Sequence, residues 1–135
     1  MPSLPLAAVH FDPERLAAVA QELNLRLVIL HGSRAEGREE GGSDIDLAIL
    51  AAGKVDIDRR LLIFRRLSAE VTGAPLDISL LNGAQPNFLA VVAETGLPLW
   101  EAAPNEFLRF CSLAARIYAD SAKWQDAQWQ HLNPD

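Results

Sequence analysis

The sequence predicts an α/β protein of the α+β kind, a small mixed β-sheet with helices packed on one face. Short apolar runs of strand length alternate with longer segments whose apolar residues recur every three or four positions. Half of the 135 residues are hydrophobic, which is enough for the core of one domain. Glycine and proline gather between these segments, where elements end. We therefore expect residues 1–135 to form a single domain.

The first half of the chain is expected to hold two strands joined by a polar connection. Asp12-Pro13-Glu14 is a typical helix start, because a capping carboxylate precedes a proline and an acid in the first turn. The residues that follow recur at helical spacing. The expected elements are a helix at 12–24, a strand at 25–30, a short helix at 33–36, a glycine-rich loop at 37–43 and a strand at 44–51.

The second half is expected to continue the alternation of helix and strand. Gly73 and Gly96 mark helix ends. The expected elements are a helix at 56–72, a strand at 75–81, a helix at 88–95, an edge strand at 97–100 and a final helix at 104–128. In the helix at 56–72, the residues expected to face inward are Leu61, Leu62, Phe64, Leu67 and Val71. The apolar stripe expected on the final helix is Phe107, Phe110, Cys111, Ala114 and Ile117.

Three aspartates are expected to meet on the open face of the sheet. Side chains alternate across a strand, so Asp44 and Asp46 share the face opposite the apolar Ile45. Asp77 alternates with apolar residues in the same way. If its strand neighbours that of Asp46, the three carboxylates converge. Such a trio suits two magnesium ions in phosphoryl transfer, with Asp77 beside the acceptor hydroxyl.

A turn that can bind phosphate precedes these acids. Gly32 follows the apolar strand and lets the backbone approach a phosphate closely. Ser33 can donate its hydroxyl and amide at a helix N-terminus, and Arg34 can neutralise phosphate charge. We predict that Gly32, Ser33 and Arg34 bind the nucleotide. His31 also precedes the glycine, but a lone histidine at a strand end is more often a packing residue, and we leave it out of the predicted site.

Composition limits the classes of partner and location. The net charge is −6, whereas proteins that bind nucleic acid usually display a basic patch, so we expect no direct nucleic-acid partner. Cys111 is the only cysteine, which excludes an intrachain disulfide, and we expect a buried, inert thiol. No apolar run is long enough to span a bilayer, and no leader is recognisable. We expect a cytoplasmic protein with no membrane partner.

The spacing of Gly32-Ser33 and Asp44-Ile45-Asp46 resembles the signature of the DNA polymerase β-like nucleotidyltransferase superfamily, with Asp77 where that family places its third acid. The short chain and the Gly-Ser-Arg-Ala turn resemble the minimal nucleotidyltransferases, the antitoxins paired with HEPN-domain toxins. The resemblance implies the polymerase β-like fold and Mg²⁺-dependent transfer of AMP from ATP. It also implies that the acceptor is a tyrosine of a HEPN ribonuclease, that the modification silences this ribonuclease, and that the two proteins form a hetero-oligomer. Relatives often carry a second basic residue where Glu36 stands here, and Arg38 is a possible substitute.

Three other functions compete with this interpretation. The chain could be a binding module that neutralises its partner by occlusion, with Trp124 and Trp129, which follow the apolar stripe of the final helix, as interface anchors. It could modify a small molecule, as the enzymes that adenylylate aminoglycosides do, although those usually carry a further domain. Terminal transfer to RNA fits the acidic charge least well.

Overall fold

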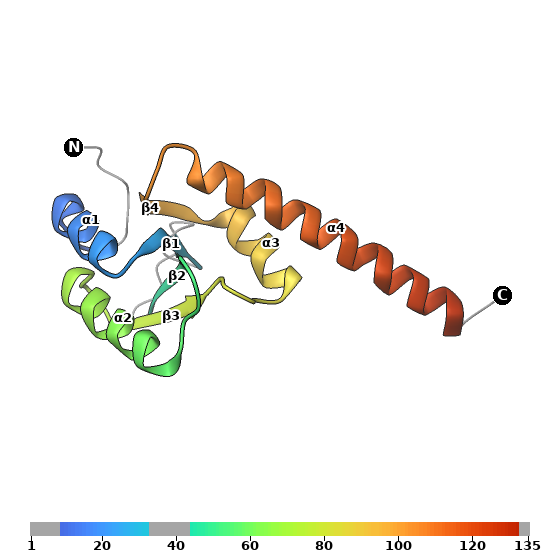
Figure 1. Cartoon of the computed structure of the whole chain (residues 1–135), viewed down its shortest axis with the longest axis horizontal. Helices are drawn as coiled ribbons and strands as arrows, with labels where there is room; N and C mark the ends of the chain where they lie inside the picture. Colours follow the sequence, from blue (N-terminus) through green and yellow to red (C-terminus); the bar gives the residue numbers. More distant parts are fainter. Residues whose placement is uncertain (1–8, 33–43, 133–135) are drawn as a thin grey trace.

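The computed structural model describes residues 9–32 and 44–132, with side chains up to residue 124. The expected short helix at 33–36 and loop at 37–43 lie outside the described residues. The described part of the chain forms four helices and four strands (Figure 1). In order they are α1 (Pro13–Glu22), β1 (Leu25–His31), β2 (Ile45–Ala51), α2 (Ile57–Glu70), β3 (Leu76–Leu80), α3 (Pro86–Thr95), β4 (Leu97–Glu101) and α4 (Glu106–Leu132).

The strands form one mixed sheet in the order β3-β2-β1-β4. β1 pairs antiparallel with both β2 and β4, whereas β2 and β3 are parallel and are connected through α2. The helix starts are as predicted: the Asp12 carboxylate accepts a hydrogen bond from the Glu14 amide at 2.9 Å, and Asp56 accepts one from the Arg59 amide at 2.8 Å. The predicted mixed sheet is confirmed, and so is the order of those predicted elements that fall within the described residues.

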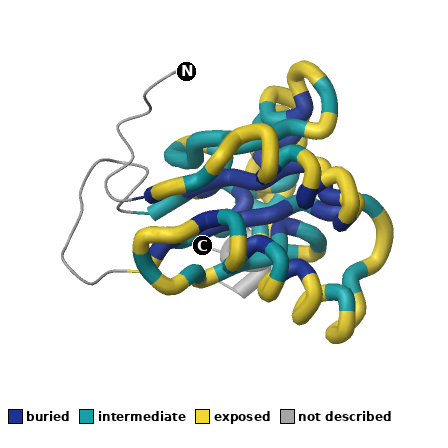
Figure 2. The backbone as a smooth tube through the Cα atoms, turned by 90° about the vertical axis from the view of Figure 1, so that its left-hand side faces the viewer, coloured by how far each residue is buried: buried dark blue, intermediate teal, exposed yellow. Residues whose placement is uncertain are grey.

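The distribution of helices over the sheet differs from the prediction of a single covered face. α1 and α2 cover the face that carries Val28, Leu30 and Leu47, and α3 and α4 cover part of the opposite face. The second face is apolar as well, because Leu27 and Ile29 of β1 are fully buried beneath α3 and α4. A central strand covered on both faces has a continuous apolar run, and β1 has one in residues 27–30. Figure 2 shows the buried backbone in the middle of the molecule, with exposed residues around it.

The inward side of α2 was predicted only in part. Leu67 and Val71 are buried as expected, and so is Ile63. Leu61, Leu62 and Phe64 are exposed, so their inward assignment is wrong. The helix is apolar on two sides, and helical spacing alone does not say which side meets the sheet.

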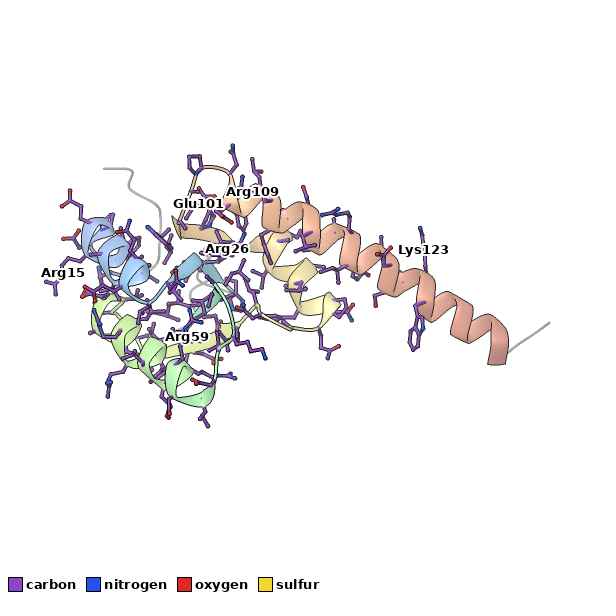
Figure 3. The ribbon with its side chains drawn as sticks, in the orientation of Figure 1. Arg15, Arg26, Arg59, Glu101, Arg109 and Lys123 are labelled. Carbon is purple, nitrogen blue, oxygen red and sulfur yellow. The ribbon has the colours of Figure 1, made fainter. Side chains whose placement is uncertain are left out.

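Two carboxylates fix the start of α4 to the sheet. Glu101 of β4 accepts a hydrogen bond from the Phe107 amide at 2.8 Å. Buried Glu106 of α4 accepts a hydrogen bond from Arg26 Nη2 of β1 at 2.9 Å and lies 3.3 Å from Arg109 Nη2. Arg26 and Arg109 are labelled in Figure 3. Burial by itself raises the pKa of Glu106, but the two arginines outweigh it and hold that pKa below the ordinary 4.5.

Beyond this anchor, α4 lies along α3 and then extends past the body of the molecule (Figure 1). The predicted stripe is confirmed, with Phe110 and Ala114 buried and its other members partly buried beside them. Cys111 is half-buried, and burial raises the pKa of its thiol, as suits an unreactive side chain. Among the described residues, no helix combines the length and apolar character needed to cross a bilayer.

Candidate active site

The strand register places two of the three predicted acids side by side. Asp46 of β2 lies opposite Asp77 of the parallel strand β3, and on its other side it lies opposite His31 of β1. Partners in register point to the same face and lie about 5 Å apart across neighbouring strands. This cross-strand row of His31, Asp46 and Asp77 lies at the edge of the face that α3 and α4 cover only in part.

The alternation that was predicted for these strands is found. Ile45 and Leu47 are buried in the core beneath α1 and α2, so Asp46 between them points to the opposite face. Leu76 and Ile78 pack against the same core and leave Asp77 on the side of Asp46. Asp77 is exposed and Asp46 is half-buried. The apolar residues of β2 and β3 therefore fix where both carboxylates point.

Gly32 lies against the carboxylate of Asp46. Its φ of +78° lies in the left-handed region that favours glycine. A Cβ atom at this position would lie 3.2 Å from Asp46 Cγ and would collide with Asp46 Oδ2. The backbone thus comes close to the acid only because residue 32 has no side chain. This arrangement supports the predicted close approach of the turn to a bound group.

The remaining predicted site residues are placed less fully. Asp44 lies just before β2, two residues from Asp46, and its side chain is exposed. Ser33 and Arg34 lie outside the described residues, as do Glu36 and Arg38. In the part of the chain that the structure describes, no three His, Cys, Asp or Glu side chains come together closely enough for a metal cluster. The register thus brings Asp46 and Asp77 together, but the full trio is not gathered.

The chemistry of the donors nevertheless suits magnesium. Carboxylate oxygens are hard ligands that Mg²⁺ prefers, and it commonly binds one or two carboxylates together with substrate phosphates. Asp46 and Asp77 supply such oxygens from neighbouring strands, and Asp44 supplies a third on the chain segment that leads into β2. These residues could hold a divalent ion together with a polyphosphate.

His31 belongs to this row although sequence reasoning left it out. Its ring meets Phe88 of α3 edge-to-face, with centroids 5.5 Å apart, and its Nε2 atom is buried without a hydrogen-bond partner among the described residues. Burial lowers the pKa of His31 below 6.5, although the charges of Asp46 and Asp77 act in the opposite direction. The ring is therefore held mainly neutral beside the acids. A signal was present in the sequence, because His31 directly precedes Gly32 on a buried strand.

Several solved structures share the fold of this chain. A toxin–antitoxin structure with AMP-PNP is 22% identical, with a TM-score of 0.71 over 90% of this chain and 98% of the other. A structure of tri-AMPylated Shewanella oneidensis HEPN toxin in complex with MNT antitoxin is 20% identical, with a TM-score of 0.64 over 89% of this chain and 94% of the other. A MntA–HepT toxin–antitoxin structure is also 20% identical, with a TM-score of 0.64 over 89% of this chain and 95% of the other.

These likenesses support the polymerase β-like fold that the sequence predicted. No curated protein matches the sequence. The family described as "Polymerase beta, Nucleotidyltransferase" matches residues 14–105, which span α1, the whole sheet, α2, α3 and the three acids. The chain belongs to this nucleotidyltransferase family.

Proposed function

We propose that this chain is a Mg²⁺-dependent protein adenylyltransferase that transfers AMP from ATP to a tyrosine hydroxyl of a HEPN toxin and acts as its antitoxin. Family membership supports nucleotidyl transfer. The similar structures include one with AMP-PNP and one with an AMPylated HEPN toxin in complex with an MNT antitoxin. Both support ATP as the substrate and such a toxin as the partner in a hetero-oligomer. We also propose that the pair acts in the cytoplasm.

The observation that carries the proposal is the juxtaposition of Asp46, Asp77 and the side-chain-free backbone at Gly32. Asp44, Asp46 and Asp77 are the residues that would hold Mg²⁺, with two ions as the expected number. When bound, the ions neutralise the charge of the triphosphate and orient it. Gly32, Ser33 and Arg34 are the residues that would bind the phosphates.

The proposed step exchanges one P–O bond for another. The acceptor oxygen bonds to the α-phosphorus of ATP, and the bond from that phosphorus to the bridging oxygen of pyrophosphate breaks. Asp77 is the exposed acid of the pair, so we assign to it the proton of the acceptor hydroxyl. Asp46 is half-buried and lies beside Gly32. This position suits a residue that acts on the nucleotide, since Gly32 belongs to the proposed phosphate-binding residues.

The test is incubation of the chain and a HEPN toxin with α-labelled ATP and Mg²⁺. We expect label on the toxin, none after EDTA, and none with Asp46→Asn or Asp77→Asn. Asp58→Asn is the matched control, because Asp58 is an exposed acid on α2 away from the row, and it should label normally. Absence of label with wild-type protein, while the toxin is still inhibited, would contradict the proposal.

That last outcome would favour the second candidate, neutralisation by occlusion. The observation behind it is α4, which extends beyond the body of the molecule and exposes 47% of Tyr118 and 64% of Trp124 (Figure 1). Trp129 lies where side chains are not described. If the chain neutralises by binding alone, Asp46→Asn protects cells from the toxin as well as the wild type does.

A further inference from the structure

An apolar stripe lies on the outward side of α2. Ile57, Leu61 and Phe64 are spaced i, i+4 and i+7, so they line one side of the helix over about 10 Å. Their exposed fractions are 73%, 62% and 45%. Together with Val55, Asp56 and Arg60, they border a shallow depression of about 520 Å³. We call Ile57, Leu61 and Phe64 the α2 stripe.

The α2 stripe makes no contribution to the core. The helix meets the sheet through Ile63 and Leu67, which are buried on its other side. Single exposed apolar residues are common, but a contiguous group of large ones on a soluble domain usually marks a binding surface. Apolar residues at this spacing over two turns form a ridge on the helix surface, and the apolar face of a second helix packs against such a ridge.

The charge beside the α2 stripe indicates the kind of partner. Arg60 follows Ile57 by three residues and Arg65 follows Leu61 by four, so each borders the stripe on one side. Within the described residues, neither guanidinium group forms a hydrogen bond or ion pair, although Asp56 and Asp58 add negative charges at the start of the helix.

The other two arginines of α2 are engaged. Arg59, which is labelled in Figure 3, donates to the carbonyl oxygens of Ala52 and Lys54, both at 2.7 Å. Arg66 pairs with Glu22 at 2.6 Å. The chain as a whole carries a net charge of −6. Two arginines without ion-pair partners beside an apolar stripe therefore differ from the acidic character of the whole chain.

We propose that the α2 stripe is the docking site for an amphipathic helix of a partner protein whose apolar face is bordered by acidic residues. Charge argues against a second copy, because a twofold contact of stripe on stripe would bring the arginine borders of the two copies together. Nucleic acid is disfavoured because two arginines provide few phosphate contacts.

Docking at the α2 stripe leaves the cross-strand row uncovered. α2 packs on the face opposite the row, and Ile57 follows the end of β2 remote from Asp46. A partner held there can present another part of itself to the acids. Docking at the α2 stripe is a binding event that requires no AMP transfer, so the two proposals can fail independently.

The test uses the full chain and two fluorescent, staple-constrained helical peptides of about 18 residues, a length that supports helix. Both carry leucines at i, i+3, i+4 and i+7, and they differ in having glutamate or lysine beside the leucines. We expect the glutamate peptide to bind the wild type at least about tenfold more tightly than the lysine peptide, measured by anisotropy. Arg60→Glu combined with Arg65→Glu should reverse this preference.

Matched variants separate the stripe from other exposed apolar residues. Leu61→Asp should weaken binding of the glutamate peptide by at least about tenfold, because it places a charge in the apolar contact. Leu108→Asp on α4 is the control, since Leu108 is 64% exposed and lies outside the stripe, and it should bind as the wild type does. Circular dichroism should show that both variants melt like the wild type.

Four results would overturn the inference. The first is no binding of the glutamate peptide by the wild type. The second is equal affinity for the two peptides, and the third is loss of binding in Leu108→Asp. A wild-type dimer in sedimentation that Leu61→Asp dissociates would also overturn it, by assigning the stripe to self-association.

Discussion

Gly32 and Asp46 occupy adjoining space, so a Cβ on residue 32 would lie 3.2 Å from Asp46 Cγ. Asp46 belongs to β2, and Gly32 directly follows the last residue of β1, next to the register pair of His31 and Asp46. The position of the carboxylate and the absence of a side chain at residue 32 are therefore linked. Any residue other than glycine must move the acid or the turn.

Gly32→Ala should reduce AMP transfer by about a hundredfold, because misplacement of a catalytic group by about 1 Å can have that effect. The measurement is the rate of toxin labelling at saturating ATP. Gly83→Ala is the matched control: Gly83 has a similar φ of +73°, but an added Cβ would meet nothing within 4 Å. Both variants should lose about 1 kcal/mol of stability from backbone strain. Equal labelling by the two variants would contradict the role given to Gly32.

The two leucines of α2 should respond differently to truncation. Leu67→Ala removes a fully buried side chain and should lower the free energy of unfolding by about 3 kcal/mol. Leu61→Ala removes an exposed one and should change it by less than about 0.5 kcal/mol. Urea unfolding followed by circular dichroism measures both. A large loss with Leu61→Ala would mean that the outward side of α2 is packed.

Glu106 should make stability depend on pH in the acid range. Its pKa in the folded protein lies below the ordinary 4.5, because the hydrogen bonds and charges of Arg26 and Arg109 outweigh the effect of burial. The stabilisation is therefore complete above about pH 4.5 and is lost as the pH falls through the lower, folded-state pKa.

Glu106→Gln should lower the free energy of unfolding at pH 7 by about 1 kcal/mol, a modest amount because both guanidinium groups are partly in solvent. The difference between wild type and variant should shrink below pH 4. Urea midpoints at pH 7 and at pH 3.5 measure it. A constant difference across this range would contradict the assigned pKa shift.

The sequence predicted local features correctly where the residue types present are compatible with only one local structure. Asp12-Pro13 fixed a helix start, and the alternation around Asp46 and Asp77 predicted the face on which both acids lie. The register that brings Asp46 opposite Asp77 could only be assumed, because strand pairing is a long-range property that local patterns do not encode.

Two parts of the account needed the structure. Leu61 and Leu67 are both apolar at helical positions, and only tertiary packing decides which one is buried. His31 was left out because a lone histidine has no distinctive spacing, and its neighbourhood with Asp46 follows from the pairing of β1 with β2. The continuous apolar run of β1 was the available signal that both faces of the sheet are covered.

The central claim is that the acids of the cross-strand row hold a divalent ion together with a nucleotide. Titration of Mn²⁺ in the presence of AMP-PNP, followed by water proton relaxation, tests this most directly because it needs no partner protein. We predict Mn²⁺ binding by the wild type and by Asp58→Asn, and a loss of about tenfold or more in affinity for Asp46→Asn and Asp77→Asn. Mn²⁺ binding by those two variants that equals the wild type, or none by the wild type, would contradict the claim.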